Sequence, residues 1–304
     1  MRTWASLAAI FLFLLGVGSA RGGETGSIQW PRSLEIAQGE LVEVQINGAD
    51  LVSVEGSWGQ KKINFYSDGK GAFFALLGAD VEAKPGRSKF AVKVVRLSGQ
   101  ERRKELPVQI RAKKFRTESF TVPPSFDQRT AEALKEIRRE QAAFKRAFRV
   151  SAAERFWEAP FVRPVPHQAS ASSFGSRRII NGARRAPHSG TDLSAPAGAE
   201  VRAANHGRAV LVGNFFFAGG SVVLDHGGGL FTMYFHLSEF KVKEGAMVKK
   251  ADVVGLSGAT GRVTGAHLHW GARLANARIE PFELLKKISN PGDRKQGAKT
   301  AATK

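Results

Sequence analysis

One short segment in the second half of the chain indicates the kind of fold: Phe231-Thr232-Met233-Tyr234-Phe235-His236. Apolar and polar side chains alternate along it, which is the pattern of a β-strand with two different faces. The three apolar side chains are expected on one face, and Thr232, Tyr234 and His236 on the other. Such a strand presents His236 on a polar surface where a chemical site can be built.

Two other segments place histidines at spacings suited to strands: His188-Ser189-Gly190-Thr191-Asp192 and His267-Leu268-His269-Trp270. On an extended chain, residues two apart share a face. His188 and Asp192 are therefore expected to converge, with Gly190 between them leaving room for an ion. The same period places both imidazoles of the second segment on one face and its two apolar side chains on the other. Three strands of this kind can line one groove.

The residue types in these segments are those of a metal-dependent hydrolytic site. Two imidazoles and one carboxylate are a catalytic-zinc ligand set that leaves the fourth tetrahedral position for water. Further histidines would remain for proton transfer and for stabilising charge. Each motif alone is common, and a lone histidine on a strand is more often structural. The combination of the motifs indicates chemistry.

The remaining histidines have ordinary explanations. All seven histidines of the chain lie in its second half. His226 precedes Gly227 at a hairpin and His206 precedes Gly207 in a turn, so both are expected to be structural. His167 lies in a proline-rich stretch and is expected to be exposed to solvent.

Composition narrows the classes of protein. The chain has 304 residues, no cysteine and a formal net charge of +19. The absence of cysteine excludes disulfide scaffolds, thiol catalysis and cysteine-ligated metals, so a metal site must use His, Asp or Glu. The positive charge favours polyanions, among them nucleic acid, anionic lipid and anionic envelope polymers, and charge alone does not choose among these.

The first 20 residues have the pattern of a secretory signal peptide. Arg2 precedes an uncharged apolar run, and small residues end at Ala20, where cleavage is expected. An uncleaved membrane anchor is the alternative, because residues 4–20 are close to the shortest spanning helix. Either way the mature chain leaves the cytoplasm, to the periplasm or the exterior, which argues against nucleic acid as a partner.

The mature chain divides into regions of different pattern. Alternating segments such as Leu41–Ile46, Phe90–Val94 and Leu106–Ile110, separated by turn residues, predict a small antiparallel β-sandwich over residues 28–112. A connecting amphipathic helix is expected over 125–150, capped by Ser125 or Asp127, with an apolar stripe that should pack on a neighbouring domain. This stripe consists of Leu134, Ile137, Phe144 and Phe148. A glycine-rich β domain follows over 161–285, and a basic tail over 286–304.

The order of motifs in the second domain resembles the lysostaphin-like (LytM-type) zinc metallopeptidases. The segments that carry the resemblance, which covers roughly 161–285, are Phe174-Gly175-Ser176-Arg177-Arg178, His188-Ser189-Gly190-Thr191-Asp192, Asp225-His226-Gly227, Tyr234-Phe235-His236-Leu237, Gly255-Leu256-Ser257-Gly258-Ala259-Thr260-Gly261 and His267-Leu268-His269-Trp270. The sandwich and helix before them look like the accessory region of many Gram-negative members. The chain departs from the family pattern at Ala266, where many members have Pro, and at Lys249-Lys250-Ala251, where a Gly is usual.

The resemblance implies zinc bound by His188, Asp192 and His269, with His267 as general base and His236 stabilising the oxyanion. It also implies a mostly β fold whose C-terminal antiparallel domain carries a long groove. The implied activity is hydrolysis of peptide cross-links between the stem peptides of bacterial peptidoglycan. Other divalent transition metals are expected to fit the same ligands in vitro.

Two other functions remain open at the level of sequence. A non-catalytic or autoinhibited member would bind peptidoglycan or activate other wall hydrolases, and the complete set of five histidine and aspartate residues argues against it. A general anion-binding envelope protein would leave the ordered histidine motifs unexplained. The sandwich has three candidate roles, which are substrate positioning, contact with a partner and occlusion of the groove.

Overall fold

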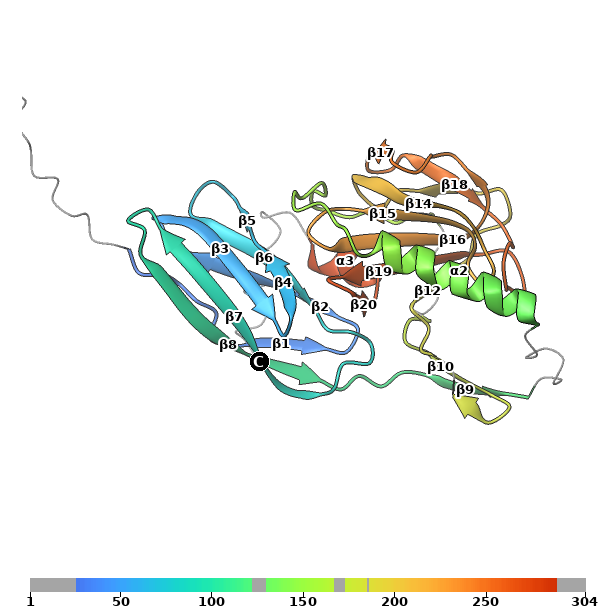
Figure 1. Cartoon of the computed structure of the whole chain (residues 1–304), viewed down its shortest axis with the longest axis horizontal. Helices are drawn as coiled ribbons and strands as arrows, with labels where there is room; N and C mark the ends of the chain where they lie inside the picture. Colours follow the sequence, from blue (N-terminus) through green and yellow to red (C-terminus); the bar gives the residue numbers. More distant parts are fainter. Residues whose placement is uncertain (1–25, 122–129, 167–172, 185, 289–304) are drawn as a thin grey trace, which may run out of the picture.

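The computed structural model describes residues 26–121, 130–166, 173–184 and 186–288. The predicted signal peptide, the expected helix caps Ser125 and Asp127, His167, and the tail from residue 289 onward lie outside these ranges. Within them, no helix is long and apolar enough to cross a membrane. The described chain is mostly β, as the sequence predicts (Figure 1).

The N-terminal sandwich, defined here as strands β1 to β8, consists of two sheets packed face to face. The larger sheet has the order β1 (Leu34–Ala37), β8 (Glu101–Arg111), β7 (Gly86–Arg96), β3 (Leu51–Trp58) and β4 (Lys61–Asn64). The smaller has the order β2 (Leu41–Asn47), β6 (Ala72–Gly78) and β5 (Tyr66–Ser67). The alternating residues of both sheets, such as Val44, Phe90 and Val108, bury one side chain in two inside a common apolar core. The three strands expected from alternation are confirmed.

A nine-stranded, antiparallel sheet forms the C-terminal part of the molecule. Its main path runs β12 (Gly190–Leu193), β19 (Leu268–Leu274), β16 (Leu230–Phe240), β15 (Gly219–Asp225), β14 (Gly207–Phe215) and β17 (Met247–Val248). Three short strands complete it, β13 (Glu200–Arg202), β18 (Val253–Ser257) and β20 (Ala277–Ile279). One apolar core, containing Tyr234 and Trp270, lies against one face and is closed by the short helix α3 (Phe282–Lys287).

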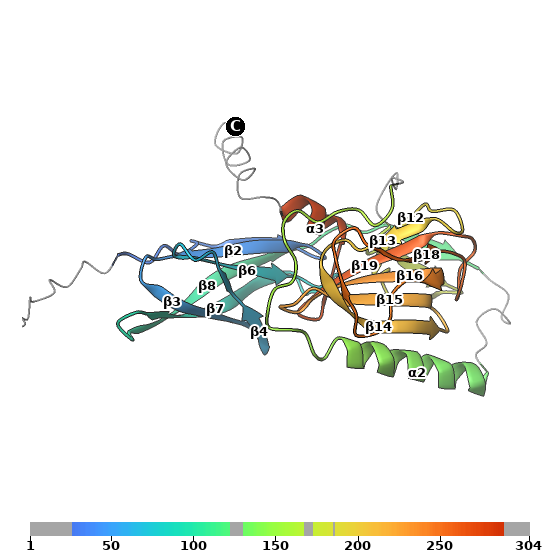
Figure 2. The ribbon, with the colours of Figure 1, turned by 90° about the horizontal axis from the view of Figure 1, so that it is seen from above.

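Helix α2 (Ala131–Ala147) covers part of the opposite face of this sheet, beside β14 (Figure 2). Its N-cap is Thr130, whose hydroxyl accepts from the backbone N–H of Ala133 at 3.2 Å. Phe144 and Phe148 pack with strand residues in a second apolar cluster. Leu134 is exposed, so the expected apolar stripe is shorter at its N-terminal end than the sequence predicts.

The sandwich contacts the C-terminal part of the molecule through several elements. Strand β9 (Thr117–Phe120) leaves the sandwich and pairs in parallel with β10 (Arg177–Ile180), which forms a hairpin with β11 (Ala183–Arg184). The guanidinium of Arg278 on β20 bonds the carboxylates of Asp80 at 2.6 Å and Glu82 at 2.7 Å. The two parts therefore contact each other directly, while the domain limits 28–112, 125–150 and 161–285 stay predictions.

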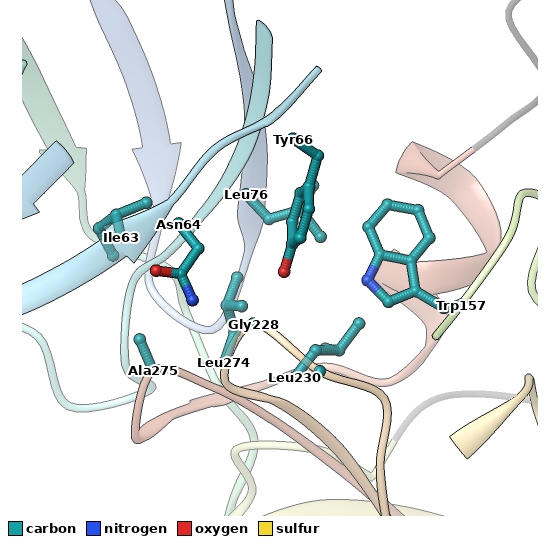
Figure 3. A pocket seen from close by; sticks show the side chains of 10 residues that line it. Ile63, Asn64, Tyr66, Leu76, Trp157, Gly228, Leu230, Leu274 and Ala275 are labelled. Atoms are coloured by element: carbon teal, nitrogen blue, oxygen red, sulfur yellow. The ribbon is translucent and has the colours of Figure 1, made fainter. Parts of the chain in front are cut away.

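An apolar seam lies between the two parts, around a cavity of about 10 Å³ (Figure 3). The Tyr66 phenol projects into it from the sandwich, with its ring edge-on to Trp157 at 6.4 Å between centroids. Opposite it, Gly228 has a positive φ of 64°, and a Cβ there would lie 1.6 Å from the Tyr66 hydroxyl oxygen. Only glycine fits between these two parts at this position.

A buried chain of hydrogen bonds fixes His226 in the core, in agreement with its expected structural role. Its Nδ1 donates to the carbonyl of His206 at 2.6 Å, so Nε2 accepts from the Thr232 hydroxyl at 2.7 Å. The Thr232 hydroxyl in turn bonds the Tyr234 hydroxyl at 2.9 Å, and that oxygen accepts from the Ala204 N–H at 2.8 Å. Complete burial lowers the pKa of His226 to about 4.

We predict that His226 makes the protein less stable in acid. Its ordinary pKa of 6.5 in the unfolded chain is higher than the folded value of about 4, so the unfolded state takes up the proton first. The free energy of unfolding should fall by about 2 kcal/mol between about pH 7 and about pH 4.5 through this one group. Urea unfolding at both pH values measures it. The His226→Gln variant should lose this part of the pH dependence, and equal slopes in both proteins would contradict the prediction.

The family departure at Ala251 falls on a turn with unusual backbone geometry. Ala251 has a φ of 70°, in the left-handed region that favours glycine. We predict that Ala251→Gly raises the free energy of unfolding by roughly 0.5–1 kcal/mol, because the steric strain of a β-carbon at a left-handed φ, which glycine lacks, is larger than the conformational entropy that glycine loses on folding. Denaturant unfolding tests this. Ala131→Gly in the first turn of α2 is the control, which should lower stability.

Candidate metal centre

Three residues from two adjacent strands and the turn before them bring ligand atoms together. The ligand atoms of His188, Asp192 and His269 all lie within 4.8 Å of one another. Asp192 Oδ1 is 3.2 Å from His188 Nε2 and 3.1 Å from His269 Nδ1, and the two nitrogens are 2.9 Å apart. Strands β12 and β19 pair with Asp192 directly opposite His269. The structure thus gathers the three residues that the resemblance implies as ligands.

Gly190 has a different part in this site from the one the sequence suggested. A Cβ at this position would lie 2.5 Å from His269 Nε2 and 2.5 Å from the Trp270 carbonyl oxygen. The missing side chain therefore makes room for the His269 ring, which lies across from it on the neighbouring strand. Sequence reasoning did not foresee this role of Gly190, and its expectation of space for an ion stays a prediction.

Ser173 orients two of the three cluster residues. His188 Nδ1 donates to the Ser173 carbonyl at 3.0 Å, which leaves the lone pair of Nε2 directed at the cluster. The Ser173 hydroxyl accepts from the backbone N–H of Asp192 at 3.0 Å. Outer hydrogen bonds of this type fix the tautomer and direction of a metal-binding histidine. Sequence reasoning missed Ser173, because its contact with His188 joins positions 15 residues apart.

The protonation states of Asp192 and His269 are those a metal requires. Burial alone would raise the pKa of Asp192, but the close approach of the His188 and His269 rings outweighs it and holds the pKa far below its ordinary value. Burial lowers the pKa of His269, so its imidazole is neutral at neutral pH. A carboxylate and a neutral imidazole are metal-binding forms. With its proton on Nε2, His269 directs a third lone pair into the cluster, and the donor set fits a divalent cation.

His267 and His236 lie beside the cluster with their rings 4.8 Å apart. His267 Nε2 is 3.6 Å from Asp192 Oδ1, and its Nδ1 donates to the Gly265 carbonyl at 2.9 Å. His236 Nδ1 donates to the Thr260 carbonyl at 2.9 Å, and burial lowers the pKa of His236 to about 4. In its neutral form either imidazole offers Nε2 as an acceptor, while only a cationic ring donates from it.

The face of strand β16 that carries His236 was predicted incorrectly. Thr232 and Tyr234, expected beside it, are fully buried in the core with His226. The opposite face carries Phe235, whose ring stacks on His269 at 5.2 Å with an interplanar angle of 5°. His236 has a φ of 67°, which breaks the alternation and brings its ring to the His269 side of the sheet. Period-two reasoning fails here because it assumes extended backbone at every residue.

Helix α2 reaches the same neighbourhood through Glu140, a residue that sequence reasoning passed over. The Glu140 carboxylate accepts from the backbone N–H of Phe217 at 2.8 Å, in the turn between β14 and β15. The next residue, Ala218, accepts from the His236 backbone N–H at 2.9 Å. Burial raises the pKa of Glu140 against the opposing effect of these backbone bonds. The turn that holds His236 is thus tied to the helix.

A cleft of about 470 Å³ lies between the sandwich and the β9–β10–β11 sheet. Its lining includes Gln38 and Lys84 from the sandwich and Arg177 and Pro187 from the other side. Pro187 directly precedes His188, although none of the five candidate site residues lines the cleft. It offers space for an extended ligand beyond the cluster itself.

These features together define a candidate metal-dependent hydrolase site, and comparison with known proteins finds a family match for the segment that carries it. Residues 186–281 match the model of peptidase family M23. The chain therefore contains a peptidase M23 domain of the LytM and lysostaphin-like type, which confirms the resemblance. All five candidate site residues lie within the matched segment.

The relatives agree with this family. Peptidoglycan DD-endopeptidase ShyA of Vibrio cholerae is 45% identical over 100 residues, which are 33% of this chain and 23% of the relative. DD-carboxypeptidase/endopeptidase Mpg of Neisseria meningitidis is 37% identical over 125 residues, 40% of this chain and 28% of the relative. The chain thus matches less than a third of the length of these relatives.

One solved structure is similar over most of the chain. A crystal structure described as a candidate M23 peptidase of Pseudomonas aeruginosa is 27% identical with a TM-score of 0.64. The similarity covers 83% of this chain and 95% of that chain, so it includes the N-terminal sandwich as well as the peptidase domain.

We predict that Gly190→Ala weakens metal binding by about ten-fold or more, because the added methyl group displaces the His269 ring from its position. Competition with a chromophoric chelator, using Zn²⁺ as the probe, measures the affinity. Gly213→Ala on β14 is the matched control, since its Cβ would meet only the Phe215 ring at 3.6 Å. Equal affinity in the two variants would show that the His269 position does not depend on Gly190.

Proposed function

We propose that the protein is a zinc-dependent endopeptidase that hydrolyses peptide cross-links of bacterial peptidoglycan. The observation that carries this proposal is the convergence of His188, Asp192 and His269, with two further imidazoles beside them, inside the segment that matches an M23 peptidase. We expect the protein to act in the periplasm or outside the cell, where this substrate lies.

His188 Nε2, an oxygen of Asp192 and His269 Nδ1 would hold the zinc ion. Zinc bound there would supply a Lewis acid that activates water and polarises the scissile carbonyl. The Ser173 carbonyl keeps the His188 proton on Nδ1, so Nε2 stays available to the metal. The stacked Phe235 ring and Gly190 hold the His269 ring in its plane.

His267 would act as the general base and pass the proton to the leaving amine. Its Nδ1–H is bound to the Gly265 carbonyl, which leaves Nε2 to accept a proton near Asp192. His236 would stabilise the oxyanion, and because its Nδ1–H is bound to Thr260, it donates from Nε2 only when the ring is cationic. Burial lowers the pKa of His236 to about 4, so this role requires that the ring takes up a proton from solvent when substrate binds and that the negative charge developing in the transition state stabilises the cationic ring.

The relatives and the charge of the chain support the proposed substrate class. ShyA and Mpg are named for peptidase activity on DD bonds, and we assign this class of bond to the present protein. The net charge of +19 would attract the protein to anionic envelope polymers. The cleft beside His188 would accommodate the part of a stem peptide that extends from the scissile bond.

We predict that the mature protein releases uncross-linked stem-peptide fragments from purified sacculi. A chelator should abolish release, and Asp192→Asn should lower it by about 100-fold or more, because one charged ligand is lost. His206→Gln, in a turn outside the candidate site, is the control and should keep full activity. Chromatography of the released muropeptides identifies the bond. Metal-loaded protein that releases nothing would contradict the proposal and favour a regulatory member of the family.

A further inference from the structure

We propose that the N-terminal sandwich holds the metal-binding residues in place, and that Phe174 is the positioning residue that transmits this support. The inference rests on the proposed metal-dependent function and extends it to a part of the chain outside the matched peptidase segment. It concerns the loop 173–176, which lies between the sandwich and the candidate metal centre.

On one side, this loop is bonded to both residues of the first ligand motif. Ser173 accepts from His188 Nδ1 with its carbonyl and from the Asp192 N–H with its hydroxyl, each at 3.0 Å. The Gly175 N–H donates to the His188 carbonyl at 2.8 Å, and the His188 N–H donates to the Ser176 carbonyl at 3.0 Å. A shift of the loop would therefore move His188. It would also break the hydrogen bond to the Ser173 carbonyl that keeps the His188 proton on Nδ1.

On its other side, the loop is anchored in the sandwich by Phe174. This ring is 6% exposed and lies on Gly39, in the turn between β1 and β2, where a Cβ would be 2.4 Å from Phe174 Cε1. The backbone of Gly39 is itself held, because its N–H donates to the Ala79 carbonyl at 3.0 Å and its carbonyl accepts from the Glu280 N–H at 2.7 Å. Phe174 thus fits against a rigid turn.

The segment that follows the last strand of the sandwich also packs against the loop 173–176. The Phe115 ring meets Phe174 edge-on at 6.3 Å between centroids, and a Cβ at Gly175 would lie 2.2 Å from Phe115. The Arg116 carbonyl then accepts from the Arg177 N–H at 2.8 Å, which begins the pairing of β9 with β10. The loop is therefore enclosed by the sandwich and its outgoing strand.

Positioning of the ligands by the sandwich and occlusion of the groove predict different effects when the contact is loosened. If the sandwich only blocked the groove, loosening its contact would leave the metal affinity unchanged and would raise turnover. If it positions Ser173 through Phe174, loosening the contact weakens metal binding. Outer-sphere partners of metal-binding histidines contribute about 10- to 100-fold to affinity.

The test compares three full-length variants. Phe174→Ala should weaken Zn²⁺ binding by about ten-fold or more in chelator competition, and Phe174→Leu should restore most of the affinity by refilling the space on Gly39. Phe65→Ala is the matched control, because Phe65 stacks on Phe90 within the sandwich core and lies in a different part of it. Affinity in Phe174→Ala within about two-fold of the control would overturn the inference. Thermal melting of the metal-free proteins confirms that all three fold.

A second measurement needs neither metal nor activity. In metal-free protein, ¹⁵N chemical shifts of His188 should report a proton on Nδ1, bound to the Ser173 carbonyl. Phe174→Ala should convert this to a mixture of tautomers, while Phe65→Ala should not. A changed tautomer in a protein without hydrolytic activity would support the positioning role and refute the proposed function, and an unchanged tautomer would refute the positioning role.

Discussion

The antiparallel pairing of β12 with β19 is the constraint on which the site depends, because it sets Asp192 opposite His269. A slip of one residue would turn every side chain of the strand to the other face. The neighbouring pair, Thr191 and Trp270, is fully buried in the core and prevents that slip. The burial of an indole on one face thus fixes the register of the polar residues on the other.

Two distant parts of the chain support the site from different directions. Glu140 on α2 ties down the turn that bonds the backbone of His236, and Phe174 connects the sandwich with Ser173 beside His188. The nine-stranded sheet sets the direction in which the ligand side chains point. The segments that precede it in the chain hold the loops around these side chains in place. The N-terminal half therefore belongs to the physical description of the site, although none of the five candidate site residues comes from it.

The sequence predicted the mostly β fold, the family and the residues that the structure gathers, because alternation and motif order are local signals. It missed Ser173 and Glu140, since a serine or a helical glutamate becomes part of a site only through contacts distant in sequence. It placed His236 on the wrong side of β16 relative to Thr232 and Tyr234, because one left-handed residue reverses the alternation. The observed cap of α2 is Thr130, while the expected caps Ser125 and Asp127 lie outside the described residues.

The left-handed backbone of His236 bears on any effort to improve this protein by selecting for heat resistance. A residue with a β-carbon held at a φ of 67° costs on the order of 1 kcal/mol that glycine would avoid. A library screened for folding alone would therefore enrich glycine or asparagine at position 236 and discard the imidazole. At this position, selection for stability favours a different residue from selection for catalytic activity.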